Sequence, residues 1–280
     1  RIVLVFAGLW WAAFSIWPLS VLKRRPGKPL LPACEMAVIG WRSTLSTLAQ
    51  AAKYRDTFTL IIVYFFYSDT YSTIAGVGIL FAQDQLCMGV FELLIVAWLV
   101  VLFAAVGSVL YVWIHRRFNI QTKSMINISL AWYFLVAVVG LIGIAPNLSF
   151  GLKTRAELYA FAVIHGINIG PIQSFGRALY ADLTIPGKEA EFFALYETTD
   201  RGSSWLGPLV VGAIYNSGGN PYLVFCYLAP MVLLPALALQ FLVDHKRGMA
   251  AVGRVPGGAT AAGAPREMAA ASSSDKRVPV

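Results

Sequence analysis

An acidic residue lies near the middle of a long apolar stretch of the chain. Asp69 stands within YFFYSDTYSTIAG at residues 64–76, where hydroxyl side chains surround it along one or two helical turns. An ionisable group inside a membrane span is costly to bury and is by default a candidate for function. We expect Asp69 either to bind a substrate ammonium group or to carry a proton. In the alternative interpretation, neighbouring hydroxyls hold the carboxylate and it only fixes packing.

A histidine lies about halfway along another apolar stretch. His165 opens HGINIGPIQSFGR and is a candidate for relaying a proton near neutral pH, although a lone histidine is more often a packing residue. Gly166 and Gly170 form a GxxxG pair that lets another helix approach closely, and Pro171 is expected to loosen the backbone hydrogen bonds of the helix. Because transporters place substrate contacts at interrupted helices, the polar side chains near this break are candidate pocket residues: Asn168, Gln173 and Ser174.

A pair of charges stands at the mouth of a further apolar stretch. Asp200 and Arg201 come directly before GSSWLGP at residues 202–208, and a charge pair in this position is expected to latch one conformation of a gate. Arg177, near the same end of its own span, is expected to belong to that gate. The other charges of this connection are expected to form a solvated face.

The composition places these residues in a membrane protein. The 280 residues are 58% hydrophobic and 13% charged, with a mean hydropathy of +0.67, whereas soluble domains are about 45–50% apolar and about 25% charged. The net charge of +8 is therefore interpreted through membrane orientation and not through nucleic-acid binding. Cys34, Cys87 and Cys226 form no metal or redox pattern, and no hydrolase, kinase or nucleotide-binding motif occurs. We expect no enzymatic activity, no metal and no cofactor.

Seven apolar runs are long enough to be membrane spans, which need about 20 residues each. The runs are continuous and lack a period of two, which favours helices over a barrel. The fifth and sixth runs are weaker because they also contain glycine and polar residues. The sequence therefore predicts an all-α transmembrane bundle, with spans at roughly 2–22, 57–82, 89–114, 124–145, 158–181, 198–216 and 221–243.

The distribution of positive charge sets the expected orientation. Residues 23–56 carry seven Lys or Arg side chains, and short loops of this kind face the cytosol. The first span, at 1–22, therefore enters a basic cytosolic loop, and the six spans of residues 57–243 return the chain to the same side. Residues 244–280 are expected to form a disordered cytosolic tail, because most of them are small or polar.

The basic loop contains one segment with helical periodicity. Val38, Trp41, Leu45 and Leu48 are spaced at steps of three, four and three within residues 36–56. This spacing predicts an amphipathic helix. The helix lies either on the inner membrane leaflet or against the bundle as a linker, and the sequence favours neither arrangement.

Residues 171–208 read PIQSFGRALYADLTIPGKEAEFFALYETTDRGSSWLGP. This stretch resembles the autophagy-related vacuole effluxer family, a branch of the major facilitator superfamily, and the resemblance covers roughly residues 1–245. The run around Asp69 is similar to the family's first helix after its central loop. Gly207 and Pro208 resemble the Gly-Pro signature that the superfamily uses in a gating helix.

The resemblance implies a carrier of twelve helices in two halves, of which this chain would supply the C-terminal half, starting at the sixth helix. Because the chain opens with Arg1 inside an apolar run, we expect further helices to precede it. The family is associated with export of leucine and other neutral amino acids from the vacuole lumen. The resemblance implies transport by alternating access, with protons as a candidate co-transported ion, in a protein surrounded by membrane lipids. A central cavity would bind the solute. Its expected lining residues are Asp69, Tyr67, Tyr71, Asn168 and Gln173.

Two other functions stay open at this level. Within transport, the side chains also fit a carrier of sugars, ions or drugs. Outside transport, a receptor or an organiser could use the basic loop and the tail to recruit cytosolic partners. Five more spans upstream would favour a carrier, and their absence would favour a protein that does not transport.

Overall fold

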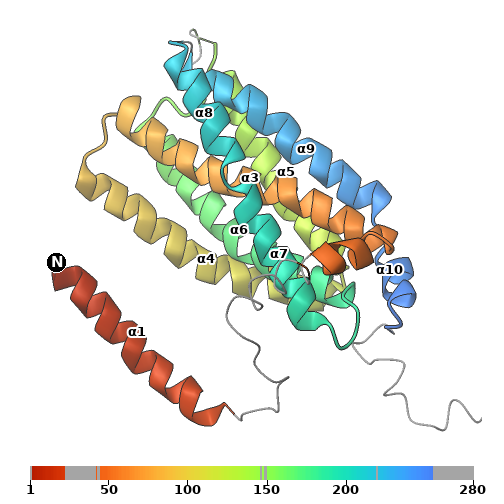
Figure 1. Cartoon of the computed structure of the whole chain (residues 1–280). Coiled ribbons are helices and arrows are strands. Elements are labelled where there is room, and N and C mark those ends of the chain that lie inside the picture. The colour runs from red at the N-terminus through yellow and green to blue at the C-terminus, as the bar shows by residue number, and fades with distance from the viewer. Residues whose placement is uncertain are drawn as a thin grey trace, which may run out of the picture. The chain divides into compact units, whose positions relative to one another are not determined.

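The computed structural model describes residues 2–22, 42, 45–145, 147, 150–218 and 220–254. All elements within these residues are helices (Figure 1), which confirms the predicted all-α fold. The chain divides into two units, Arg1–Arg42 and Ser43–Val280. In the first unit, α1 (Ile2–Val21) is a single apolar helix at the position of the first predicted span.

The second unit carries the remaining helices of the described residues. The long helices come first, and α7 and α8 together occupy the position of the sixth predicted span. In chain order they are α3 (Arg55–Asp84), α4 (Val90–Phe118), α5 (Thr122–Ile142), α6 (Arg155–Asp182), α7 (Glu189–Ser203), α8 (Leu206–Asn216), the 3-10 turn η1 (Pro221–Leu223), α9 (Val224–Leu242) and α10 (His245–Ala251).

Five helical stretches among the described residues are long and apolar enough to cross a membrane. They are Leu4–Val21 of α1, the whole of α3, α4 and α5, and Pro221–Leu242, which joins η1 to α9. The sequence predicted two more. α6 has 28 residues but carries many polar side chains, and the sixth predicted span is divided between α7 and α8. The count of seven spans therefore stays a prediction.

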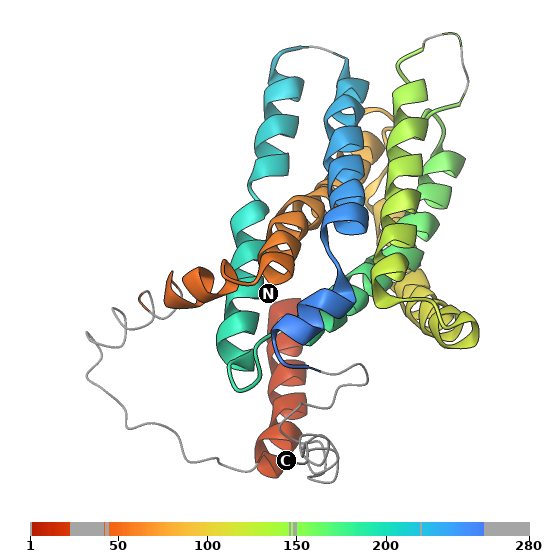
Figure 2. The ribbon, with the colours of Figure 1, turned by 90° about the vertical axis from the view of Figure 1, so that its right-hand side faces the viewer.

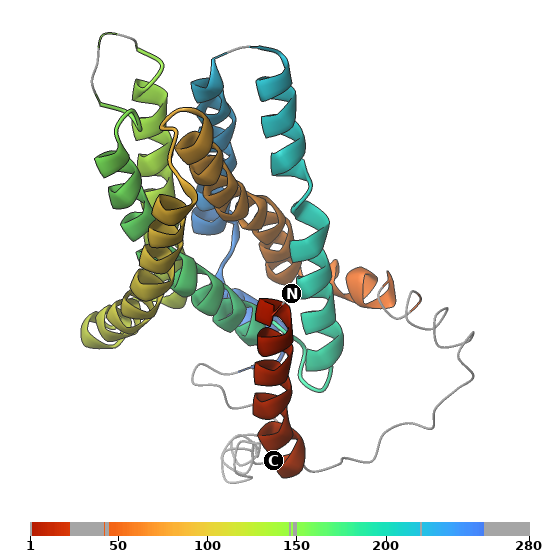
Figure 3. The same cartoon turned by 90° about the vertical axis from the view of Figure 1, so that its left-hand side faces the viewer.

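Helix α3 occupies the centre of the second unit. It contacts α6, α7, α8 and α9, while α4 packs along α6 and α5 packs along α9. Figures 2 and 3 show the pair α7–α8 on one side of α3 and the helices α4, α5 and α6 on the other. In α4 the buried residues are Gly107 and Tyr111, and apolar side chains cover its other faces, as expected for a helix that faces lipid. In the polar stretch of α3, Ser68, Asp69, Thr70 and Thr73 are buried, while Ser72 is exposed.

Glycines set the close contact between α4 and α6. A Cβ added at Gly166 would lie 2.7 Å from the carbonyl oxygen of Val100, and one added at Gly170 would lie 3.0 Å from that of Ala104. Both distances are shorter than a normal van der Waals contact, so only glycine fits at this spacing of the helices. The prediction that the GxxxG pair admits a close neighbour is confirmed.

The described part of the basic loop packs against the start of α7. Residues 45–51 are helical, and the hydroxyl of Thr47 donates to Glu191 at 3.2 Å, while Lys188 donates to the side chain of Gln50 at 2.5 Å. These contacts favour the linker arrangement for this part of the predicted amphipathic helix. Leu45 and Leu48 are exposed, and residues 36–41 lie outside the described residues.

Residues 244–254, which we call the C-terminal clasp, fold back from the end of α9 onto the start of α3. The Arg247 guanidinium donates to both carboxylate oxygens of Asp56, at 2.6 and 2.9 Å. The backbone amide of Asp244 also donates to Asp56, at 2.9 Å. Asp56 is almost fully buried, so these bonds replace the hydrogen bonds to water that its carboxylate loses on burial. The same hydrogen bonds raise the pKa of Arg247 above its ordinary value, which keeps the guanidinium charged.

The clasp also reaches the end of α6 and the loop that follows it. Nε2 of His245 lies 3.0 Å from the carboxylate of Asp182. Arg254, only 15% exposed, donates to the carbonyl oxygen of Thr184 at 2.9 Å. The clasp therefore joins the ends of α3, α6 and α9 at one end of the bundle.

The predicted disordered tail at residues 244–280 is wrong for residues 245–251, which form α10. The carboxylate of Asp244 caps this helix by accepting from the amides of Lys246 and Arg247. Polar contacts of this kind order a segment that buries little apolar area, and composition alone does not reveal them. Residues 255–280 lie outside the described residues.

The clasp yields a test with a matched control, because Arg247 and Lys246 are neighbouring exposed cations of which Arg247 binds Asp56. We expect Arg247→Ala to increase amide hydrogen exchange across residues 244–254, because a buried carboxylate loses its charged partner. Lys246→Ala should leave that exchange near its original rate. Equal exchange in the two variants, measured by mass spectrometry in detergent, would show that the ion pair does not hold the segment.

Candidate functional site

The N-terminus of α8 is capped by a residue of another helix. α7 ends at Ser203 and α8 begins at Leu206, and Trp205 at the N-cap position provides no side-chain hydrogen bond. The first amides of a helix lack partners within the helix and carry partial positive charge. The amide of Gly207 donates to Oδ1 of Asp69 in α3 at 3.0 Å. Asp69 thus supplies the cap that α8 itself lacks.

The second oxygen of Asp69 is also bound within the protein. The hydroxyl of Tyr227 in α9 donates to Oδ2 at 3.2 Å, and only 1% of the residue is exposed. The carboxylate therefore joins α3 to α8 and α9 and does not face an open cavity. Its contacts match the packing alternative of the sequence analysis: besides a backbone amide and a distant tyrosine, the neighbouring hydroxyl of Thr73 interacts with the carboxylate.

A second carboxylate, that of Asp200 in α7, binds side chains of α3. Its Oδ1 accepts from the hydroxyl of Tyr64 at 2.8 Å and from that of Tyr71 at 3.3 Å. The hydroxyl of Ser68 donates to the same oxygen. Hydrogen bonds to a charged acceptor are stronger than those between neutral groups. Asp200 therefore joins α7 to α3, while Asp69 joins α3 to α8.

The three charged residues of the predicted gate, Asp200, Arg201 and Arg177, have different surroundings in the structure. Asp200 faces α3, while Arg201 is exposed and has no ion pair recorded among the described residues. The two side chains therefore lie in different surroundings, because adjacent residues on a helix do not face each other, and their role in a gate stays a prediction. Arg177 pairs with Glu197 of α7 at 3.3 Å, with both side chains about half exposed. Ion pairs this exposed contribute little stability.

Gly207 and Pro208 lie where α8 meets α3. A Cβ at Gly207 would collide with the side chain of Thr73, so the absence of a side chain allows the close approach that Asp69 needs. Tyr67, by contrast, is buried with its hydroxyl unpartnered among the described residues. Its neighbour Tyr64 stacks on Tyr196 of α7, with ring centroids 3.9 Å apart.

The predicted residues on α6 lie in a different part of the bundle. His165 is buried between the rings of Phe161 and Tyr133, and its Nδ1 has no partner within the described ranges. The side-chain oxygen of Asn168 accepts from Tyr111 of α4 at 2.6 Å. Gln173, a further candidate, is partly buried. Among the described residues, no hydrogen bond links these side chains to Asp69 or Asp200.

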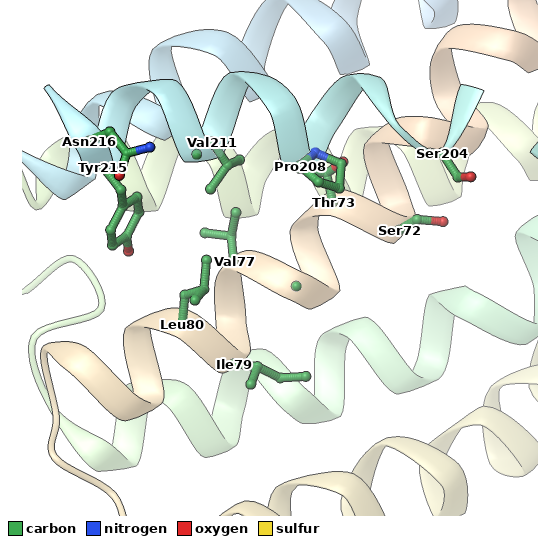
Figure 4. A pocket seen from close by; sticks show the side chains of 12 residues that line it. Ser72, Thr73, Val77, Ile79, Leu80, Ser204, Pro208, Val211, Tyr215 and Asn216 are labelled. Carbon is green, nitrogen blue, oxygen red and sulfur yellow. The ribbon is translucent and has the colours of Figure 1, made fainter. Parts of the chain in front are cut away.

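A pocket of about 610 Å³ lies between α3 and α8 (Figure 4). The sequence did not predict it, although small residues recur at steps of four along both helices, and two of them, Gly76 and Gly212, have no atom within 4 Å of where a Cβ would lie. Ser72 and Gly76 follow this pattern in α3, and Ser204, Pro208 and Gly212 follow it along α8 and the turn before it. The lining residues are Ser72, Thr73, Gly76, Val77, Ile79, Leu80, Ser204, Pro208, Val211, Gly212, Tyr215 and Asn216.

Among the described residues, no group of three His, Cys, Asp or Glu side chains is placed to hold a metal ion. The free cysteines Cys87 and Cys226 are both exposed.

Comparison with known proteins shows which family the chain resembles. The family described as "Vacuole effluxer Atg22 like" matches residues 1–253. The chain belongs to this family. The family consists of effluxers, which are transporters, so the prediction that the chain is not an enzyme is confirmed. No solved structure matches the chain.

Curated relatives carry names from the same family. "Autophagy-related protein 22" of Gibberella zeae is 33% identical over 89% of this chain and 39% of its own length. "Autophagy-related protein 22-1" of Phaeosphaeria nodorum is 34% identical over 89% of this chain and 47% of its own length. "Autophagy-related protein 22-2" of Emericella nidulans is 30% identical, covering 89% and 44%. The chain thus spans less than half the length of these relatives.

The capping contact distinguishes two roles for Asp69. We expect Asp69→Asn to keep the thermal stability of the protein in detergent within about 0.5 kcal/mol, because Asn caps a helix nearly as well as Asp. Asp69→Leu, of similar size, should lose roughly 1–2 kcal/mol because the α8 amide is left without an acceptor. If the two variants are equally destabilised, the charge itself is required and the capping role is wrong.

Proposed function

We propose that this chain is the C-terminal half of a multi-pass carrier in the vacuolar membrane that exports amino acids to the cytosol after autophagic protein breakdown. The observation that carries the proposal is a pair of carboxylates at a helix break: the buried Asp69 of α3 binds α8, and the partly buried Asp200 of α7 binds α3. Buried ionisable groups of this kind mark solute or ion pathways in membrane proteins. The family membership supports export from the vacuole.

The mechanism proposed is alternating access, in which this six-helix half rocks against a preceding half. Such motion needs contacts that hold one arrangement and exchange in another. Asp200 is suited to such an exchange, because its partners are hydroxyl groups on α3. Separating a carboxylate from neutral hydroxyls costs less free energy than separating it from a buried, oppositely charged side chain. Asp69 holds α8 against α3 and α9, so we assign it to the positioning of α8.

The orientation is part of the proposal. The clasp and the start of α3 lie at the end of the bundle that carries Lys53, Arg55, Lys246 and Arg247, and positive residues favour the cytosolic side. The loop at residues 23–56 and the C-terminus would then be cytosolic. At the other end, Arg155 of α6 pairs with Glu92 of α4 at 2.5 Å, which would close the lumenal ends of these two helices.

The solutes proposed are leucine and other neutral amino acids, with protons from the lumen as the co-transported ion. Neutral amino acids carry one ammonium and one carboxylate group, and they need polar partners that this half supplies from α3 and α7. A carrier of sugars or drugs could bind its solute through the same hydroxyl groups of α3. The solute is therefore identified by measuring efflux.

Efflux from vacuoles tests the proposal. Vacuoles preloaded with labelled leucine are prepared from cells that make a carrier of full family length containing this chain, this chain alone, or neither. We expect release from the first, and release from the second no faster than from the third, because half of the solute pathway is supplied by the preceding helices. Correct insertion into the vacuolar membrane is checked in each case. Release that is no faster with the full-length carrier than without it would contradict the proposal.

A further inference from the structure

A furrow runs between α4 and α5. Both helices pack against α6 but hardly touch each other, so α6 forms the floor between them. Near the turn that joins α4 to α5, the furrow widens into a hollow of about 300 Å³. It is lined by Leu110 and Ile114 near the end of α4, by Ile128 and Trp132 near the start of α5, and by Ile167 of α6.

A second hollow continues the furrow along α5. It has a volume of about 520 Å³, shares Ile128 and Trp132 with the first hollow, and reaches Val138. From Met125 to Val138 the two hollows extend about 20 Å, at a rise of about 1.5 Å per residue. One leaflet of a bilayer whose hydrocarbon core is about 30 Å thick is about 15 Å deep. The furrow therefore spans the depth that a lipid acyl chain reaches from one membrane surface.

The furrow is apolar and open along its rim. Leu110, Ile128 and Trp132 are 40%, 38% and 43% exposed. Two polar side chains line the first hollow, and they satisfy each other, because the hydroxyl of Tyr111 donates to Asn168 at 2.6 Å. A helix about 10–12 Å across would occupy roughly 2,400 Å³ over about 30 Å of hydrocarbon, several times the volume of either hollow. The furrow thus suits a single apolar chain and not a further helix.

Arginines stand where the furrow meets the turn between α4 and α5. Leu110, Ile114 and Arg117 follow one another at steps of four and three, so they share one face of α4. Side chains of a helix lean toward its N-terminus, which directs Arg117 toward the furrow. Arg117 and the neighbouring Arg116 are exposed, and neither has an ion pair among the described residues. Two unpaired positive charges therefore stand at this end of the furrow.

No acidic residue balances this charge along the two helices, because residues 93–156 contain no Asp or Glu. Lys123, just past the turn, donates to the carbonyl oxygens of Gln240 and Val243 at the end of α9. The arginines thus lie at the same end of the bundle as the start of the clasp. Toward the opposite end of α5, a further hollow is lined by the carboxylate of Glu157, which repels an anion. An anionic group is therefore favoured at the arginine end alone.

We propose that the furrow between α4 and α5 binds an anionic phospholipid, with an acyl chain in the two hollows and the headgroup at Arg117 and Arg116. Arginine binds phosphate and carboxylate groups through parallel N–H bonds, and basic sites between spanning helices bind anionic headgroups. The site is independent of the proposed solute pathway, and only its assignment to the cytosolic leaflet rests on the proposed orientation. A bound lipid contacts α4, α5 and α6 and joins two helices that hardly contact each other.

Photo-crosslinking from the acyl chain tests the site in the full-length carrier. The carrier is placed in phosphatidylcholine nanodiscs with a trace of phosphatidylserine or phosphatidylcholine that carries a diazirine on its acyl chain, and labelled peptides are mapped by mass spectrometry. We expect phosphatidylserine to label residues 110–114 and 125–138 at least several-fold more than phosphatidylcholine. Equal labelling by the two lipids would overturn the proposal. Absence of labelling by both would also overturn it, because preceding helices or a second copy would then cover the furrow.

One pair of variants tests the headgroup contact. Arg117→Gln removes the charge at the furrow, whereas Lys246→Gln removes an exposed cation of the clasp. We expect Arg117→Gln to lower labelling by phosphatidylserine to near the level of phosphatidylcholine, because the headgroup loses its charged partner. Lys246→Gln should leave the labelling at its original level. Equal labelling in the two variants would overturn the assignment of the headgroup to Arg117.

A second pair tests the position of the chain. Ala131→Phe adds bulk to the second hollow, and Ala105→Phe adds the same bulk at an exposed position of α4 that lines neither hollow. We expect Ala131→Phe to reduce labelling of residues 125–138 by phosphatidylserine several-fold, because the acyl chain is displaced. Ala105→Phe should not reduce it. Equal labelling in these two variants would show that the chain does not lie in the furrow.

Discussion

A carboxylate inside a membrane bundle must find partners within the protein, and this constraint organises the second unit. Asp69 and Asp200 stand on different helices, and each is bound by groups that lie outside its own helix. Because lipid offers no hydrogen bonds, the helices that carry these groups have to pack together. The central position of α3, in contact with α6, α7, α8 and α9, follows from the polar residues along it.

The same constraint explains why the sixth apolar run is not one continuous helix. A helix that ends at Ser203 and starts again at Leu206 has new amides without helical partners at its start, and one of them, the amide of Gly207, binds Asp69. Gly207 allows the approach by leaving room for Thr73. Where α3 and α8 continue past this contact with small residues on both sides, the pocket opens. The cap and the pocket therefore have one structural origin.

Much of this architecture could be predicted from the sequence, because it depends on local composition and periodicity. Apolar runs predicted the helices, and the GxxxG pair predicted the close contact of α6. Asp69 was singled out as an acidic residue within an apolar run, and Asp200 as part of a charge pair at the start of another. Their partners depend on which helices become neighbours, so the backbone amide of Gly207 and the hydroxyl of Tyr227 had no signal in the sequence. The C-terminal clasp was missed for a similar reason, since its order comes from a distant ion pair with Asp56.

The central claim is that hydrogen bonds from α3 to Asp200 hold α7, the first part of the interrupted helix, against α3. A double-mutant cycle on Tyr64→Phe and Asp200→Asn in the full chain, measured as the free energy of unfolding in detergent, tests it most directly. Residues that share a hydrogen bond show coupling energies of roughly 0.5–3 kcal/mol, and we predict a coupling in this range. Strict additivity of the two substitutions would show that the contact does not contribute to stability, and the account would be contradicted.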